Sequence, residues 1–339
     1  MTALALRPLP WRRMGWITWR QHRLALAGAG ALLAAAAGWV LSTGLRMHHA
    51  YASVVACRPL GSDVCQRVAN DFANTYAGMA SATTGLLLVV PALIGAFTGA
   101  PVLAREFETG TFRYSFTQGI GRTRWTVAKL VPLAVAVTAG AAAFSVLFSW
   151  AYQPIIGKQY GFSPLQPLMF SARGVAFAGW TLATFAIGAL AGALIRRVVP
   201  ALFATLAVWA ALAFGTGLYL RDHYEAPKVS TDPNIGNPHW LLSQEWLRNG
   251  KPASLPMLDG VLHQIDVRAV TPEVFQPGPG TPENIDPVQY LAQHGFTQLT
   301  TYQPAGRFWL FQSIEGGWLF ALAVLLIATT LWLVRRRTS

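Results

Sequence analysis

Six long apolar runs decide what this chain can fold into. Each run is 19 to 23 residues long and contains no Asp, Glu, Lys or Arg, and about 20 apolar residues in a helix cross the roughly 30 Å hydrocarbon core of a bilayer. The runs are continuously apolar instead of alternating at every second residue, which favours helices over barrel strands. They occupy residues 24–45, 82–104, 130–152, 174–195, 198–220 and 316–334. We therefore predict an all-α integral membrane protein with six transmembrane helices.

The composition supports the same fold class. Hydrophobic residues make up 53% of the 339 residues and charged residues only 12%, whereas a soluble globular chain carries roughly 25% charged residues. The first run is longer than the apolar segment of a cleaved signal peptide, which spans about 7–15 residues. We therefore expect it to be retained as a membrane span.

The basic residues predict the orientation of these spans. With the amino terminus inside, the cytoplasmic pieces are residues 1–23, 105–129, 196–197 and 335–339. They hold 15 of the 26 Lys and Arg residues, but only Glu106 and Glu108 of the 14 acidic residues. This is the positive-inside bias of membrane proteins, so we predict both termini in the cytoplasm. The bias accounts for the net charge of +12 without a nucleic acid, and no nucleic-acid-binding motif accompanies it.

The amino-terminal segment, residues 1–23, has the pattern of an interfacial amphipathic helix. Arg12, Arg13, Arg20 and Arg23 fall within one arc of a helical wheel, while aromatic and aliphatic residues occupy much of the remainder. Such a helix would lie along the inner membrane surface, with its cations among anionic lipid headgroups. A basic flank without a defined helix is the alternative.

An external loop over residues 46–81 contains both cysteines of the chain, Cys57 and Cys65. In an oxidising compartment these two residues can form a disulfide that closes the loop. Two free thiols are the alternative.

A larger extracytoplasmic segment over residues 221–315 separates spans five and six. It holds 11 of the 21 prolines, which predicts short elements joined by turns and therefore a small mixed lid. Within it, residues 239–250 are expected to form a short amphipathic helix that stops near Gly250. Residues 296–303 have the β-branched and aromatic content of a strand.

Motifs for catalysis or cofactor binding are missing from the sequence. We find no GxxxxGK[ST], HExxH, CxxC or GxSxG pattern. His48 and His49 could bind a metal, but without further ligands a solvated pair is the simpler interpretation. We therefore predict no catalytic residue, no metal and no cofactor.

The predicted spans contain no ionisable side chain of the kind that ion-coupled carriers use, and only Lys129 lies at an inner edge. If the protein transports a substrate, its energy is therefore expected from a separate ATPase.

Glycine pairs spaced four residues apart mark two of the spans. "GAFTG" places Gly95 and Gly99 in the second span, and "GALAG" places Gly188 and Gly192 in the fourth. Such GxxxG steps permit close approach of two helices. We expect packing contacts within the chain, with contacts between two copies as the alternative.

The stretch "APVLAREFETGTFRYSFTQGIGRTRWTVAKL" resembles the segment between the second and third spans of ATP-binding-cassette exporter permeases of the second type. That family has an acid, then Gly-Thr, then an Arg and a Lys before the next span. Glu108, Gly110, Thr111, Arg122 and Lys129 occupy these positions here. The family's usual Pro before the Arg is replaced by "QGIG". The late "YQPAGRFWLFQSIEGG" is similar to a bacterial branch of the family, so the resemblance covers nearly the whole chain.

The resemblance implies a permease of the bacterial plasma membrane, homodimeric or paired with a second permease, and served by cytoplasmic ABC ATPase subunits. The loop 105–129 would then act as the coupling element. In it Glu106 and Glu108 would offer carboxylates to the ATPase. Aromatic anchors for the ATPase would come from Phe112, Tyr114 and Phe116. A tether whose aromatic side chains sit in the membrane interface is the alternative.

Two functions remain at this point. The resemblance favours a permease that exports an amphipathic lipid-like, drug-like or peptide substrate. The alternative is a non-transporting membrane sensor, immunity or assembly protein whose external lid binds a ligand.

Overall fold

A computed structural model of the chain describes residues 11–59, 62–110, 121–158, 161–232, 235–262 and 291–337. Within these residues, six helical segments are long and apolar enough to cross a membrane. They are Gly30–Ala56, Asp63–Thr109, Thr123–Ala151, Gly174–Ile195, Val198–His223 and Ala305–Arg336. The prediction of a multi-pass helical membrane protein is therefore confirmed.

The first two helices extend well beyond the apolar runs. α1 covers Trp11–Ala56 and α2 covers Asp63–Ile94, so most of the predicted external loop 46–81 is helical. Polar residues outside the hydrocarbon need not end a helix, so both helices continue into this stretch. α1 stops just before Pro59, which cannot continue a helix. α2 starts where the Ser62 hydroxyl accepts a hydrogen bond from the Cys65 N–H (3.3 Å).

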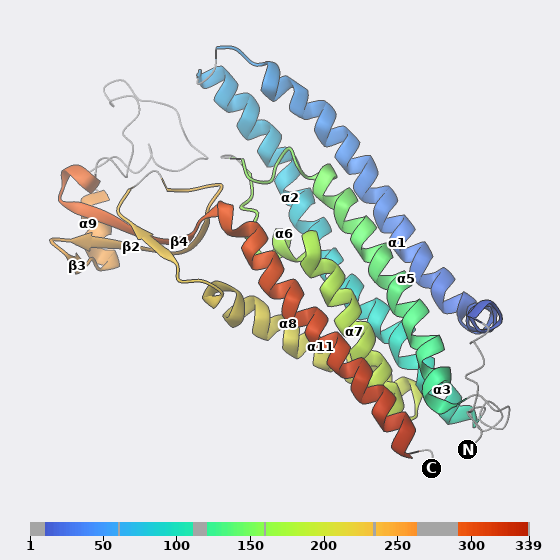
Figure 1. Cartoon of the computed structure of the whole chain (residues 1–339). Coiled ribbons are helices and arrows are strands. Elements are labelled where there is room, and N and C mark those ends of the chain that lie inside the picture. The colour runs from blue at the N-terminus through green and yellow to red at the C-terminus, as the bar shows by residue number, and fades with distance from the viewer. Residues whose placement is uncertain are drawn as a thin grey trace.

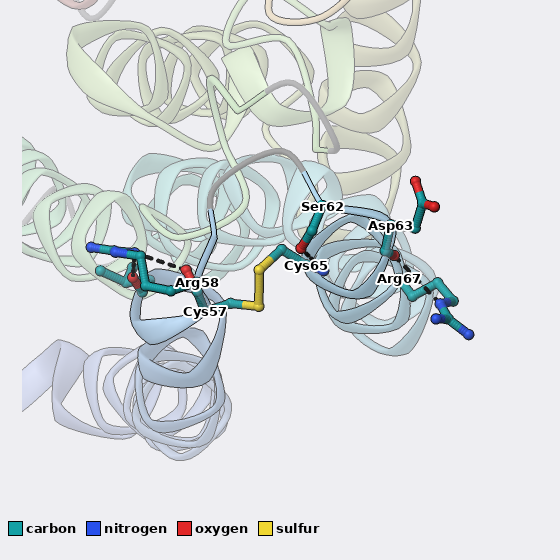
Figure 2. The surroundings of a disulfide bond; sticks show 7 residues. Cys57, Arg58, Ser62, Asp63, Cys65 and Arg67 are labelled. Atoms are coloured by element: carbon teal, nitrogen blue, oxygen red, sulfur yellow. Dashed lines mark hydrogen bonds between the residues drawn. A yellow bond between two sulfur atoms is a disulfide. The ribbon is translucent and has the colours of Figure 1, made fainter.

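The disulfide predicted between Cys57 and Cys65 closes the turn between these two helices (Figure 2). The two Cα atoms lie 5.6 Å apart. Arg58 donates hydrogen bonds to the carbonyl oxygens of Val55 (2.9 Å) and Cys57 (2.8 Å). The end of α1 and the start of α2 are therefore fixed to each other covalently, and Arg58 satisfies one of the last carbonyls of α1, that of Val55.

The second span changes its helical pitch in the middle. α2 passes into a π-helix, η1 (Gly95–Gly99), and then into α3 (Ala100–Thr109). A Cβ atom on any of the four glycines of the two GxxxG steps would clash with the backbone of the facing helix. Gly188 thus lies against Gly95 and Gly99 within one chain, and Gly192 lies against Ala100. This close approach places η1 and α3 directly on the fourth span.

The fourth span, α7 (Gly174–Ile195), is the centre of the bundle. It packs against α2, α3, α5 (Arg122–Ala151), α8 (Val198–Gly215) and α11 (Phe308–Arg337). Figure 1 shows it between α5 on one side and α8 and α11 on the other. It is the most deeply buried of the six spans.

The connection between α5 and α7 is part of the core. It includes the short helix α6 (Pro167–Ser171), and its side chains Ile155, Leu165 and Phe170 are fully buried. An apolar connection of this kind needs protein around it, since its backbone is mostly irregular. It closes one end of the bundle between α2 and α7.

The segment after α8 continues as the π-helix η2 (Thr216–Leu220) and the 3₁₀ turn η3 (Arg221–His223). The last span starts with the 3₁₀ turn η5 (Ala305–Arg307) and runs into α11. Both helical segments are longer than the apolar runs from which spans five and six were predicted. The first and last residues of the predicted lid 221–315 therefore belong to the helical segments of spans five and six.

A four-stranded antiparallel sheet with the order β1-β4-β2-β3 forms the core of the predicted lid. Its strands are β1 (Lys228–Ser230), β2 (Trp240–Arg248), β3 (Lys251–Pro252) and β4 (Phe296–Gln303), and helix α9 spans Leu255–Leu262. The strand predicted over residues 296–303 is confirmed.

The helix predicted over residues 239–250 was wrong, because β2 occupies most of that stretch and pairs with β4 from Trp240 to Arg248. Its end is a two-residue hairpin turn, Asn249–Gly250, with positive φ at both residues (53° and 76°). Asn-Gly is a strong signal for such a turn, and here it ends a strand instead of a helix.

The bundle has two distinct ends. Figure 1 shows the sheet and the turn between α1 and α2 at one end, which we call the sheet end. The end of α3, the start of α5 and the carboxyl end of α11 lie at the other, which we call the loop end. The first turns of α1, dark blue in Figure 1, are seen end-on at the loop end and so run across the direction of the remaining helix.

Candidate functional site

The predicted coupling residues lie at the loop end wherever the structure describes them. Glu106 and Glu108 occupy the last turn of α3, and Gly110 ends that helix with a positive φ of 71°. Arg122 is the first residue of α5, and Lys129 lies two turns further along it. Thr111, Phe112, Tyr114 and Phe116 lie outside the described residues.

Glu106 and Lys129 form an ion pair between α3 and α5. Both side chains are largely buried, and the ammonium of Lys129 lies 4.4 Å from the centre of the Trp125 ring. In the described part of the chain, Glu106 Oε2 and Lys129 Nζ have no further hydrogen-bond partner. The Glu106 carboxylate is therefore engaged with Lys129 within the chain, and its contact with an ATPase stays a prediction.

Glu108 reaches a different helix. Its Oε2 accepts a hydrogen bond from the backbone N–H of Val198 (3.1 Å), the first residue of α8. This N–H has no partner within its own helix, and a carboxylate at a helix start is stabilised by the helix dipole. Glu108 is otherwise exposed, so it can cap α8 and still be reached from outside.

The corner between α7 and α8 rests on the same part of α3. Arg196 ends α7 in the left-handed conformation, with a φ of 60°. Its guanidinium lies 5.6 Å from the centre of the Phe107 ring. Three neighbouring residues of α3 thus contact α5, the α7–α8 corner and the start of α8. A displacement of the chain after α3 would therefore be transmitted to several helices at once.

The sheet end holds a second buried ion pair, between Arg221 of η3 and Glu315 of α11. Arg221 Nε donates to Glu315 Oε2 (3.0 Å) and Nη2 donates to Oε1 (2.8 Å). Nη1 also donates to the carbonyl oxygen of Pro167 (3.2 Å) and Nη2 to the Ser171 hydroxyl (2.9 Å). The planar fork of an arginine suits such bidentate binding of a carboxylate. The pair fixes the end of span five to the start of span six and to α6.

Two further donors complete the hydrogen bonding of Glu315. The indole N–H of Trp180 donates to Oε1 (2.9 Å), and the Tyr224 hydroxyl donates to Oε2 (3.2 Å). Burial, followed by the nearby carboxylate, raises the pKa of Tyr224 above its usual value. The phenol therefore stays protonated and keeps its role as a donor, while its oxygen accepts from Trp318 Nε1 (3.1 Å).

Sequence reasoning missed this second pair. Arg221 directly follows the fifth apolar run and Glu315 directly precedes the sixth, so both were assigned to the borders of the lid. The helical segments are longer than the runs, and they carry both charges into the bundle. The available signal was that Arg221 borders the fifth run and Glu315 borders the sixth, which places two opposite charges at the same end of two consecutive spans.

The histidines do not form a metal site where the structure describes them. His48 packs on the Trp150 ring, with ring centres 4.8 Å apart, and its Nε2 donates to the Trp150 carbonyl oxygen (2.9 Å). Among the described residues no cluster of three or more His, Cys, Asp or Glu side chains could hold a metal ion.

Comparison with known proteins gives one match. Residues 30–221, more than half of the chain, match the family described as ABC-2 membrane transporter related. No curated protein and no solved structure matches the chain. The matched part includes the first five spans up to Arg221, the glycine contacts, and the residues of α3, α5, α7 and α8 that contact one another at the loop end. The chain therefore belongs to the ABC-2 membrane transporter related family.

Proposed function

We propose that this protein is the permease subunit of an ATP-binding-cassette exporter of the bacterial plasma membrane, and that a separate cytoplasmic ATPase drives it. Both termini and the loop end would face the cytoplasm, in agreement with the positive-inside bias. The observation that carries the proposal is the set of contacts at the end of α3. Glu106 binds Lys129 of α5, and Glu108 caps α8.

The proposed coupling loop, residues 105–129, is therefore connected to more than its two flanking helices. A push on the loop would reach α5 through the Glu106–Lys129 pair and α8 through Glu108. α8 belongs to the least buried of the six spans, so it can shift with little loss of packing. α7 is held in the centre of the bundle and would serve as the fixed reference.

An exposed apolar surface on α8 and η2 is available for a paired arrangement in the membrane. Phe203, Phe214 and Leu218 are largely exposed, as is Leu86 on α2. Such a surface can face lipid or a second permease. The apolar spans suit an amphipathic lipid-like, drug-like or peptide cargo, which we take as the substrate class.

The test is purification of the protein from its native membrane, with identification of what accompanies it. We expect an ABC ATPase to co-purify, and its activity to rise with substrate. In a Phe112→Ala/Phe116→Ala variant the ATPase should be lost, because removing anchoring aromatic side chains typically costs about 2 kcal/mol or more. This corresponds to roughly a 30-fold weaker contact.

A control removes exposed apolar side chains at the opposite end of the bundle. Trp309 and Leu310 are exposed at the start of α11, and a Trp309→Ala/Leu310→Ala variant should retain the ATPase. Isolation of the unaltered protein without any ATPase would reject the exporter. Equal ATPase retention by both variants would instead leave the loop as a tether.

A further inference from the structure

A cavity of about 550 Å³ lies beside the Arg221–Glu315 pair, inside one copy of the chain. Small-molecule sites in proteins have volumes of roughly 300–1,000 Å³. Its walls come from α2, α6, α7, α8, η2 and η3. All six elements belong to the candidate membrane spans or to the buried connection α6, so the cavity is not part of the sheet.

The walls of the cavity are almost entirely apolar and rich in aromatic rings. Phe177 and Trp180 are buried behind it, and Trp209 is half-buried at its side. Val89 of α2 and Leu218 of η2 also line the cavity, yet they are 42% and 78% exposed. The cavity therefore opens sideways between α2 and α8. Since both helices belong to candidate membrane spans, we expect the opening to face hydrocarbon.

The charge of the cavity restricts what can bind. Among the described residues Arg221 is the one charged residue in the lining, and its charge is matched by Glu315, which is fully buried behind it. A charged ligand would therefore leave an uncompensated charge in a low-dielectric site, which is costly. A neutral ligand has no such penalty.

One donor remains for such a ligand. Each terminal nitrogen of a guanidinium carries two N–H groups. Nη2 of Arg221 donates to Glu315 and Ser171, but Nη1 has a single acceptor, the Pro167 carbonyl oxygen, in the described part of the chain. A ligand with a carbonyl or hydroxyl oxygen can accept the remaining hydrogen bond.

The π-helix η2 contributes open space to the cavity wall. Gly217 lies in η2 and lines the cavity, and a Cβ atom added there would meet no other atom within 4 Å. π-helical turns occur frequently at functional sites. Gly217 is thus a position where a larger side chain would fill the cavity without disturbing the backbone.

We propose that this cavity binds a neutral amphiphile, with an apolar and preferably aromatic body and one hydrogen-bond-accepting oxygen, which enters from the bilayer between α2 and α8. Its role as the substrate site rests on the proposed function. Binding itself needs neither ATP nor an ATPase.

The test uses the full-length protein in phosphatidylcholine nanodiscs and the fluorescent ketone prodan, which is neutral and carries one carbonyl oxygen. We expect saturable binding above that of empty nanodiscs. A Gly217→Trp variant should bind prodan at least about tenfold more weakly, a change of about 1.4 kcal/mol, because the indole fills the cavity. Gly215→Trp is the matched control, since Gly215 lies two residues away, also has open space and does not line the cavity.

A second probe tests the charge argument. Dimethylaminonaphthalene sulfonate has a similar ring system but carries a negative charge, and it should bind the unaltered protein at least about tenfold more weakly than prodan. Equal binding of the two probes would overturn the neutral class. Equal prodan binding by Gly217→Trp and Gly215→Trp would overturn the site. If, in addition, Gly217→Trp changed the oligomeric state of the protein, the opening would be a contact between two copies of the chain.

The natural source of the ligand can be separated in the same preparation. A bilayer lipid is the source if mass spectrometry finds one that co-purifies with the unaltered protein and with Gly215→Trp, but not with Gly217→Trp. A dissolved hydrophobic compound is the source if prodan binds and no lipid behaves this way. Prodan binding without a co-purified ATPase would support the site and reject the exporter. A co-purified ATPase without prodan binding would support the exporter and reject the site.

Discussion

The two buried ion pairs of the bundle differ in how completely their polar atoms are satisfied. At the sheet end, Glu315 accepts two hydrogen bonds from Arg221 and one each from Trp180 and Tyr224. At the loop end, Glu106 and Lys129 have only their mutual contact and the nearby Trp125 ring in the described residues. Both pairs join two spans, yet only the first is embedded in a network.

This difference indicates different tasks. A buried pair whose lone pairs are all used is held in one geometry, and separating it would leave several unsatisfied groups. A pair with a single contact can separate at lower cost, particularly near the edge of a span where a lysine can reach the interface. The sheet end is therefore held as a fixed joint, whereas the pair at the loop end separates more easily, as the proposed coupling to an ATPase would require.

The largest effect is expected from breaking the fixed joint. Glu315→Gln leaves the buried Arg221 without a counter-charge, which should lower the free energy of unfolding by about 3–5 kcal/mol. The measurement is unfolding of the purified protein by titration with a denaturing detergent. Glu225→Gln is the matched control at the same end. Glu225 is exposed and forms a long ion pair of 3.9 Å with Arg307, so this substitution should lower the free energy of unfolding by less than about 1 kcal/mol. Equal losses would refute the assignment of a fixed joint.

The disulfide at the sheet end should have the next largest effect. A Cys57→Ala/Cys65→Ala variant releases a short loop and is expected to lose roughly 2.5 kcal/mol of unfolding free energy. Reduction of the unaltered protein should produce a similar loss, and the double variant should not respond to reductant. A protein that is equally stable with and without the bridge would remove the disulfide from the rigid sheet end.

A smaller loss is expected when the loop-end pair is broken. Glu106→Gln should cost about 1–2 kcal/mol, because Lys129 loses one contact and can turn toward the interface. Detergent-induced unfolding gives the comparison, with Arg105→Gln as the control, since Arg105 is exposed in the same turn. A loss as large as that of Glu315→Gln would mean that the two ends are equally rigid.

The smallest effect concerns the cap on α8. Glu108→Gln keeps an acceptor but loses the charge, and should cost about 0.5 kcal/mol, whereas Glu108→Ala should cost about 1 kcal/mol. Hydrogen exchange of peptides that contain Val198, measured by mass spectrometry, should be slowest in the unaltered protein, faster in Glu108→Gln and fastest in Glu108→Ala. Unchanged exchange in the alanine variant would show that Glu108 does not hold the start of α8 in solution.

The sequence was most informative where hydrophobicity alone decides the structure. Six apolar runs predicted six helical spans, because backbone groups in hydrocarbon must be satisfied within the helix. The pairing of Cys57 with Cys65 was also predictable, since the chain has no other cysteine. The ends of the helices were not, because propensity and capping, and not hydropathy, determine where α1 stops and α2 starts.

The errors arose where a residue's role depends on a distant partner. Trp240–Arg248 has an apolar pattern that suits either a helix or a strand, and only the pairing with β4 and the Asn249–Gly250 turn decide between them. Arg221 and Glu315 lie 94 positions apart, so local composition could not reveal their contact. Glu106 likewise finds Lys129 only after the two flanking helices pack.

The glycine contacts have a consequence for the order in which the protein is made. Gly95 and Gly99 leave the ribosome long before Gly188 and Gly192, so their flat helical face has no partner until the fourth span is inserted. During that interval the first three spans must be kept in the bilayer by their own hydrophobicity. Insertion of α7 then brings Gly188 against Gly95 and Gly99 and Gly192 against Ala100, and the bundle gains its centre when somewhat more than half of the chain has been synthesised.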